Sequence, residues 1–430
     1  MLPPDHPRRL ELNDEVHARP PEALVPPLRL SYLALVAAGP DERQRQWEAL
    51  AAIARWQGRP LPIQGSSHYG ADFDGFRLAS ERHTEFTRYT IIAPGDGTRP
   101  FAEPAAALLP DGWIAGLPGQ LMVAAHVVVL RHDDQGPVDH EALSRTLFGG
   151  NVLIGSGIAG GAGTALTDFR IGPDGFSRFL LFDRGMSPRQ AGRMVQRLLE
   201  IESYRMLALL ALPIARELAP VLSGFERELA TITTAMTAED KPVDEPALLD
   251  RLTRLEAAID SREADHHYRF SASRAYHDLV LRRIAELREE RLPGLQTFEE
   301  FMERRLAPAM ATCESVSSRL QSLSERVARA TQLLSTRVAI ARERQNQVVL
   351  ETMNRRVALQ LRLQETVEGL SVAAITYYIV GLIAYLAKGA SAFGLPFSAD
   401  AVVGAMIPVV LLATAFALRR FRRRAIRPPT

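Results

Sequence analysis

Residues 359–389, LQLRLQETVEGLSVAAITYYIVGLIAYLAKG, change from a charged helical pattern to an apolar one without a proline, and the first glycine is Gly369. Residues 370–387 contain no Asp, Glu, Lys, Arg or His. Because an α-helix rises about 1.5 Å per residue, a run of this length just crosses the ~30 Å hydrocarbon layer of a bilayer. The segment therefore predicts a helix that continues from water into a membrane.

A second apolar run, 401–418, follows the first. The residues between the two runs include glycine and proline, which are typical of a short loop between helices. We therefore expect a transmembrane helix at 370–388, a loop at 389–400 and a second transmembrane helix at 401–418. A buried helical hairpin of a soluble protein is the alternative, but it leaves the arginine-rich segment 419–430 unexplained and lacks the polar alternation of a surface helix.

Basic residues are unevenly placed around these two runs. The arginines that flank the runs are Arg355, Arg356, Arg362, Arg419, Arg420, Arg422, Arg423 and Arg424, whereas the basic residue of the connector is Lys388. Because basic residues concentrate in cytoplasmic segments, both flanks, including the basic tail 419–430, are predicted to be cytoplasmic. Residues 1–20 contain no apolar run that would form the core of a signal peptide. We expect a multi-pass protein of the inner (cytoplasmic) membrane with both termini in the cytoplasm.

The composition limits how many folded units the chain can form and which classes of protein it can belong to. With 430 residues, 23% of them charged and 47% hydrophobic, the chain is long enough for two or three folded units. A formal net charge of +1 argues against a general nucleic-acid binder. The single cysteine, Cys313, excludes an internal disulfide and a cysteine-rich zinc site, as in chains of a reducing compartment.

Residues 186–369 carry the pattern of long helices. Ser187 is a predicted N-cap, followed by proline at the first helical position, while Pro213 and Pro220 should kink or divide the helix. A second amphipathic helix is predicted for 245–292, ended by Pro293 and the glycine after it. A third is predicted to begin near 295 and to continue into the first apolar run. We interpret this region as a helical bundle or coiled coil.

The third helix contains a seam of apolar residues alternately four and three apart. Its members are Val316, Leu320, Leu323, Val327, Ala330 and Leu334, and after one extra step of four the pattern resumes at Val338, Ala341, Gln345 and Val348. Such spacing is typical of a coiled coil with one stutter. The partners of the seam are either the two preceding helices or other copies of the chain, and we expect both.

Residues 1–185 have a different pattern. Runs rich in β-branched and aromatic residues at 28–37, 87–94 and 119–132 predict strands, and 41–58 has helical periodicity. A hairpin is predicted at 167–183, around the turn 172–175. Strands and helices that mix without strict alternation favour an α+β fold, so we predict a cytoplasmic mixed α/β domain here.

One glycine-rich segment resembles a dinucleotide-binding turn. Gly155, Gly157 and Gly160 have the required order, and Asp174 follows about 20 residues later. The helix that should receive the pyrophosphate is missing, because Gly161 and the predicted hairpin follow directly. A tight glycine turn is therefore the preferred interpretation, and no cofactor-binding residue is predicted.

No catalytic motif is present, so we predict that the protein is not an enzyme and assign no catalytic or metal-binding residue. Histidines and carboxylates that invite other interpretations lack the spacing of ligands or the partners of an acid–base pair. They are His126, His132 and His140 with Asp133 and Asp134, His266 and His267, and Glu11, Glu15, His17 and Arg19. We interpret the histidines as surface residues, and no sequence partner fixes the geometry of the group at 11–19.

Several long stretches resemble a known family. They are ELNDEVHARP at 11–20, ERHTEFTRYT at 81–90, TDFRIGPDGFSRFLLFDRGMSPRQAGRMVQRLLEIESYRMLALLALPIARELAP at 167–220 and QLRLQETVEGLSVAAITYYIVGLIAYLAKG at 360–389. The chain is similar over its whole length to a bacterial family of uncharacterised membrane-anchored proteins, domain-of-unknown-function family 3422. The resemblance implies membrane anchoring and implies no activity.

Two functions remain open. In the first, the protein is a membrane-anchored scaffold or regulator whose α/β domain binds an unknown cytoplasmic partner or ligand. In the second, several copies form an ion channel or transporter with a layout resembling CorA, gated by the cytoplasmic domain. Ser371, Tyr378 and Tyr385, seven apart on one helix face, would line a pore or pack another helix. The Gly-Met-Asn signature of CorA is missing. The expected partners are the lipid bilayer and further copies through the long helices, and no nucleic acid.

Overall fold

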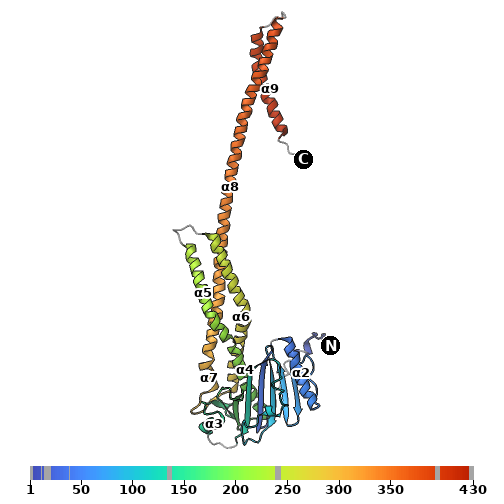
Figure 1. Ribbon diagram of the computed structural model, residues 1–430, viewed down its shortest axis with the longest axis vertical. Helices are drawn as coiled ribbons and strands as arrows, with labels where there is room; N and C mark the ends of the chain where they lie inside the picture. The colour runs from blue at the N-terminus through green and yellow to red at the C-terminus, as the bar shows by residue number, and fades with distance from the viewer. Residues whose placement is uncertain are drawn as a thin grey trace. The chain divides into compact units, whose positions relative to one another are not determined.

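The computed structural model describes residues 3–10, 12–13, 21–37, 39–132, 138–237, 244–392 and 398–425. Two compact units can be distinguished, Met1–Thr331 and Gln332–Thr430. The first unit contains a sheet and long helices, which confirms the predicted α+β class (Figure 1).

The described residues of the first unit form a sheet of nine strands in the order β2-β3-β4-β1-β5-β8-β7-β6-β9. The strands are β1 (Leu28–Val36), β2 (His68–Phe73), β3 (Phe76–Arg82), β4 (Phe86–Pro94), β5 (Gln120–Arg131), β6 (Ile154–Ile158), β7 (Gly163–Thr167), β8 (Ser177–Asp183) and β9 (Glu290–Arg291). Strands β5 and β8 pair in parallel, and the other pairs of named strands are antiparallel. The predicted strands at 28–37, 87–94 and 119–132 correspond to β1, β4 and β5 in the centre of this sheet.

The helices of the described residues follow the same chain order. They are α2 (Pro40–Trp56), the 3-10 helix η1 (Ala105–Leu108), α3 (His140–Leu147), α4 (Pro188–Leu209), α5 (Ala211–Thr237), α6 (Glu245–Leu287), α7 (Phe298–Arg305), α8 (Ala307–Ala392) and α9 (Ala399–Ala425). Helix α4 begins as predicted, because the Ser187 side chain accepts a hydrogen bond from the Gln190 N–H. Helices α4 and α5 meet at Leu210, where Pro213 prevents the regular helical hydrogen bonding of the preceding turn.

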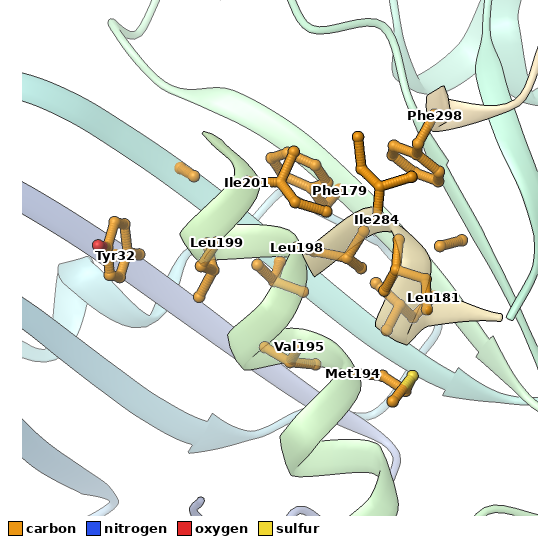
Figure 2. Close-up of a cluster of buried hydrophobic side chains, with 14 of the residues drawn as sticks. Tyr32, Phe179, Leu181, Met194, Val195, Leu198, Leu199, Ile201, Ile284 and Phe298 are labelled. Carbon is orange, nitrogen blue, oxygen red and sulfur yellow. The ribbon is translucent and has the colours of Figure 1, made fainter. Parts of the chain in front are cut away.

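One face of the sheet packs against helices. Figure 2 shows side chains of β1 and β8 facing side chains of α4, α6 and α7. The labelled residues are Tyr32, Phe179, Leu181, Met194, Val195, Leu198, Leu199, Ile201, Ile284 and Phe298, and all are buried. The apolar face of α4 therefore lies against the sheet, as its helical periodicity requires.

The opposite face of the sheet is covered in two parts. Over β1 to β4, side chains of α2 such as Leu50 and Ile53 pack on Leu33, Leu78 and Ile91. Over β5 to β8, a second cluster contains Val128, Phe148, Leu153, Leu166, Leu180 and Phe182. These two clusters leave the boundary between β1 and β5 free for the cavity described below.

Several predicted elements differ from the structure. The helix predicted for 245–292 ends at Leu287, because Arg288 adopts a left-handed conformation, and Pro220, a predicted break, lies inside α5. The hairpin predicted at 167–183 exists, but its first arm is β7, so residues 168–176 form the connection rather than an arm. Thr167 begins that connection with a side-chain hydrogen bond to the Arg178 carbonyl, which ends the regular ladder. The helix predicted to begin near 295 is divided: Thr297 and Glu300 form a capping box that starts α7, and Leu306 separates α7 from α8.

Three stretches of the described helices are long and apolar enough to cross a membrane, judged by length and composition. They are Pro188–Thr237, Phe298–Gly389 and Ala399–Leu418. The last two contain the predicted spans 370–388 and 401–418. The first was not predicted, and its apolar character has another explanation, because Leu198, Leu207 and Leu222 are buried in the core of the first unit.

Candidate functional site

The apolar parts of α8 and α9 expose large hydrophobic side chains. On α8 these include Leu370, Leu382 and Leu386, and on α9 they include Leu412 and Phe416, each 64–75% exposed. Water is an unfavourable surrounding for so much contiguous apolar surface. These two segments therefore require a cover that the described residues of this chain do not supply.

Helices α8 and α9 contact each other within the second unit. The hydroxyls of Thr376 and Thr414 lie 3.0 Å apart, so one can donate to the other while the remaining hydroxyl donates to the carbonyl four residues earlier in its own helix. Thr376, Ala387 and Val410 are buried. Small polar groups of this kind join helices in apolar surroundings.

The predicted face of Ser371, Tyr378 and Tyr385 lies away from this contact. Tyr378 and Tyr385 are 72% and 79% exposed, and Ser371 is half-buried and donates to the Val367 carbonyl. The three residues share one face of α8, and that face is not the one that Thr376 presents to α9. Their aromatic and hydroxyl groups are therefore available to a lipid or to another helix.

The predicted topology residues lie on α8 and α9. Arg355, Arg356, Arg362 and Lys388 are exposed on α8, and Arg420 is exposed on α9. Arg419, Arg422, Arg423 and Arg424 lie in the C-terminal turns of α9. These residues flank the apolar segments along α8 and α9, and the membrane topology that they indicate stays a prediction.

The seam of α8 is buried in its first part. Val316, Leu320, Leu323 and Val327 are buried within the first unit, where Arg319 forms an ion pair with Glu226 of α5 at 2.9 Å. Ser324 of α8 faces Asp260 of α6. Leu334 and Val338 are buried too, whereas Ala341, Gln345 and Val348 are exposed. The preceding helices therefore cover the early seam, and the later part has no cover among the described residues.

A buried ionic network joins the sheet to the helices. The Arg88 guanidinium of β4 contacts Glu81 of β3 at 2.6 Å and Glu200 of α4 at 3.4 Å, and Arg283 of α6 contacts the same Glu200. Burial alone would disfavour the charged guanidinium, but the carboxylates of Glu81 and Glu200 raise the pKa of Arg88 above its usual value. The network fixes β4 and two helices to one another through paired charges.

A cavity of about 240 Å³ lies at the boundary of β1 and β5, under the loop 94–104. Its lining includes Arg29, Arg99, Phe101, Glu103, His126 and Leu130. Arg29 donates to the backbone oxygen of Glu103 at 2.6 Å and pairs with the Glu103 carboxylate at 3.1 Å, which ties the loop to β1. The lining is mixed, with the charged side chains of Arg29, Arg99 and Glu103 beside apolar ones such as Leu130.

The backbone of the loop above this cavity is strained. Phe101 has φ of 67°, a left-handed conformation that bulky residues seldom adopt. Its ring contacts the edge of Phe148, and the Arg178 guanidinium lies 5.5 Å from the ring centre. Strain of this kind persists only where the surroundings hold it, and it is frequent at binding sites.

His126 was wrongly predicted to be a surface residue: it is buried in the central strand β5, where it lines the cavity as a neutral side chain. Its ring stacks on Phe176 with 3.9 Å between centroids, and Nδ1 lies 2.9 Å from the Ser31 hydroxyl. Burial lowers the pKa of His126 to about 4. The Ser31 hydroxyl also accepts a hydrogen bond from the Ala106 N–H at 2.9 Å, so one serine side chain joins the His126 ring to the segment after the loop.

The other sequence-predicted candidates do not come together. His132 follows β5, and His140 begins α3. Within the described ranges there is no group of three or more His, Cys, Asp or Glu side chains that would hold a metal ion. Asp133, Asp134, Glu11, Glu15, His17 and Arg19 lie outside the described residues.

The glycine segment is part of the sheet. Gly155 and Gly157 lie in β6, and Gly160 and Gly161 form the turn to β7 with positive φ. A Cβ on Gly155 would collide with Leu166 and with the backbone of Ala165. The glycines are thus required by close strand packing, and no helix follows them to receive a pyrophosphate.

Sequence reasoning missed the cavity and the ionic network. Arg29 lies far from Phe101 and Glu103 in the sequence, and none of the three residues belongs to a recognisable sequence motif. The alternation within 28–36 was a usable signal, because Arg29 and Ser31 occupy the face opposite Leu28 and Leu30.

Comparison with known proteins identifies a family without adding an activity. Neither the curated proteins nor the solved structures include a significant match to this chain. A family model described as "Protein of unknown function (DUF3422)" matches residues 4–425, nearly the whole chain. The chain belongs to this family, which confirms the resemblance seen in the sequence.

Proposed function

We propose that this protein is a membrane-anchored cytoplasmic scaffold or regulator, in which α8 and α9 anchor the sheet-containing unit to the inner membrane. The observation that carries the proposal is the exposed apolar surface of α8 and α9, from Leu370 to Leu386 and from Ile407 to Phe416. A bilayer removes this surface from water at roughly 25 cal/mol per Å². Basic residues at the ends of both segments favour a cytoplasmic location for the N- and C-terminal sides.

The regulatory part of the proposal rests on the cavity between β1 and β5. The strained backbone at Phe101 and the neutral side chain of His126 are more typical of a site for a small ligand than of a packed core. The proposed role is binding, because Ser31, whose hydroxyl lies 2.9 Å from His126 Nδ1, is fully buried and is not among the residues that line the cavity. The expected partners are the bilayer, a second copy of the chain, and a cytoplasmic ligand or protein.

The second candidate is an oligomeric channel or transporter with a CorA-like layout. The exposed face of Ser371, Tyr378 and Tyr385 favours it, because such a face would line a pore if several copies met there. Residues 370–387 and 401–418 contain no charged residue that would mark an ion path. We therefore rank the anchored scaffold or regulator first.

The test compares the full chain with a chain that ends before Leu370. Membranes from cells expressing each form are washed with alkaline carbonate and pelleted. The full chain should stay in the pellet and should leave it only with detergent, whereas the shortened chain should be released. Release of the full chain by carbonate would refute the membrane anchor.

The channel candidate has its own readout. The purified full chain is reconstituted in vesicles and its ion flux is compared with that of Tyr378→Ala. Flux that depends on Tyr378 would favour the channel, and vesicles as tight as protein-free ones would favour the anchor alone.

A further inference from the structure

Helix α8 has a long segment that no other part of the described chain covers. Every residue from Ala339 to Val367 is exposed. The exposed large hydrophobic residues of this segment are Ile340, Val348, Val349, Leu350, Met353, Val357, Leu359, Leu361, Leu363 and Val367. A helix with so much apolar surface in water is ordinarily stabilised by a partner.

The apolar residues gather along one side of this segment. A stripe with alternating steps of three and four consists of Leu350, Met353, Val357, Gln360, Gln364 and Val367. We call it the α8 stripe. Val349, Leu361 and Leu363 widen it at its edges. This spacing is the seam of a coiled coil.

The ionisable residues avoid the stripe. Arg355 is two residues from both Met353 and Val357, and two residues turn a helix by about 200°, so Arg355 lies on the opposite side. Arg362 lies on that side as well, two residues from Gln360 and from Gln364. Two copies that met along the stripe would therefore keep Arg355 and Arg362 away from the contact, whereas Arg356, seven residues from both Val349 and Leu363, lies at its edge.

The same spacing continues into the apolar part of α8. The next members are Ser371, Ala374, Tyr378, Gly381 and Tyr385, of which three are small residues that let helices approach closely. Helix α9 leaves this face open, because Thr376, which contacts Thr414 of α9, is two residues from Ala374 and from Tyr378. One continuous face is thus uncovered on both sides of Gly369.

We propose that a second copy of this chain packs along the α8 stripe and its continuation, parallel and in register, with each residue opposite its own equivalent. The parallel orientation rests on the proposed function, because two copies anchored in one membrane from the same side must point the same way. Gln360 and Gln364 suit such a partner, since an amide is both donor and acceptor and can pair with an identical amide. Polar residues at seam positions specify register in this manner.

The experiment uses cysteine cross-linking in native membranes. The only cysteine, Cys313, is buried and therefore gives little background. Met353→Cys and Val357→Cys place a thiol on the stripe. Val348→Cys places one on the opposite side, two residues from Leu350, at the end of the seam predicted from the sequence, which this proposal does not use beyond Val348. Val357 and Val348 are a matched pair, both valines and 52% and 62% exposed. Membranes are oxidised mildly and analysed on non-reducing gels.

The proposal predicts that most of the Met353→Cys and Val357→Cys chains form a disulfide-linked dimer, and that Val348→Cys and the unmodified chain remain monomeric. Two differently tagged copies expressed together should give a Val357→Cys dimer carrying both tags. Equal cross-linking at positions 348 and 357, cross-linking to a different protein, or none at 353 and 357 would overturn the proposal.

The carbonate wash of the same membranes separates this proposal from the anchor. Chains that stay in the pellet but fail to cross-link would refute the pairing alone. Chains that leave the pellet would refute the anchor, whatever their cross-linking.

Discussion

At the scale of single residues, His126 shows how burial changes chemistry. Its ring is stacked on Phe176 and bonded to Ser31, and its pKa is lowered by burial to about 4 from 6.5. In the unfolded chain the same side chain takes up a proton near pH 6.5. Between pH 4 and pH 6.5 the unfolded state therefore binds more protons than the folded state, so acid favours unfolding. The full contribution of His126 to the free energy of unfolding is present only above pH 6.5.

We predict that the free energy of unfolding falls by roughly 3 kcal/mol from this residue alone between pH 6.5 and pH 4. The three tryptophans, Trp47, Trp56 and Trp113, all lie in the sheet-containing unit, so their fluorescence reports its unfolding in urea. His126→Gln should flatten the pH profile in this window. An identical profile for the variant and the unmodified chain would show that His126 is not buried as a neutral base.

Glu200 illustrates the cost of an unpaired charge. We predict that Glu200→Gln destabilises the sheet-containing unit by about 3–5 kcal/mol, because Arg88 and Arg283 lose a buried carboxylate partner. Glu228→Gln is the control, since Glu228 pairs with Arg251 at the surface and should cost at most about 1 kcal/mol. Equal effects of the two variants on the urea midpoint would contradict the buried network.

At the scale of elements, the β6–β7 hairpin explains the glycine-rich segment. The order of Gly155, Gly157 and Gly160 matches a dinucleotide turn, yet the glycines permit close packing of strands. The sequence already excluded the helix that a cofactor site needs. It did not reveal that Gly155 lies against Ala165 and Leu166, because contacts between strands depend on register, which local pattern does not specify.

We predict that Gly155→Ala destabilises the sheet-containing unit by about 1–3 kcal/mol, because the added methyl group collides with β7. Gly224→Ala, in α5 with open space around it, should instead stabilise by up to about 1 kcal/mol through helix propensity. Urea unfolding followed by tryptophan fluorescence measures both. A neutral Gly155→Ala would argue that the segment is not packed as a hairpin.

Helix ends and apolar runs were predictable because their signals are local. Ser187 and Pro213 mark the start and end of α4 directly in the sequence. The start of α7 at the Thr297–Glu300 capping box was a local signal that could have been used, whereas the division between α7 and α8 at Leu306 was missed. Strands such as β2 and β6 were missed too, because short strands rich in glycine and polar residues have weak alternation.

At the scale of the whole molecule, the class of fold and the apolar segments followed from the sequence, and the cavity did not. The cavity needs Arg29 of β1, the loop at Phe101 and His126 of β5 to meet, which depends on the order of strands in the sheet. The account as a whole depends on the membrane anchor, from which the parallel pairing of α8 also follows.

The most direct measurement is the accessibility of single cysteines to a membrane-impermeant maleimide in intact cells. Lys388→Cys lies between the two apolar segments, whereas Arg355→Cys and Arg420→Cys lie on their outer flanks. The account predicts that the reagent labels Lys388→Cys from outside the inner membrane and labels the other two only after the membrane is permeabilised. Labelling of Arg355→Cys from outside, or equal labelling of all three positions, would contradict it.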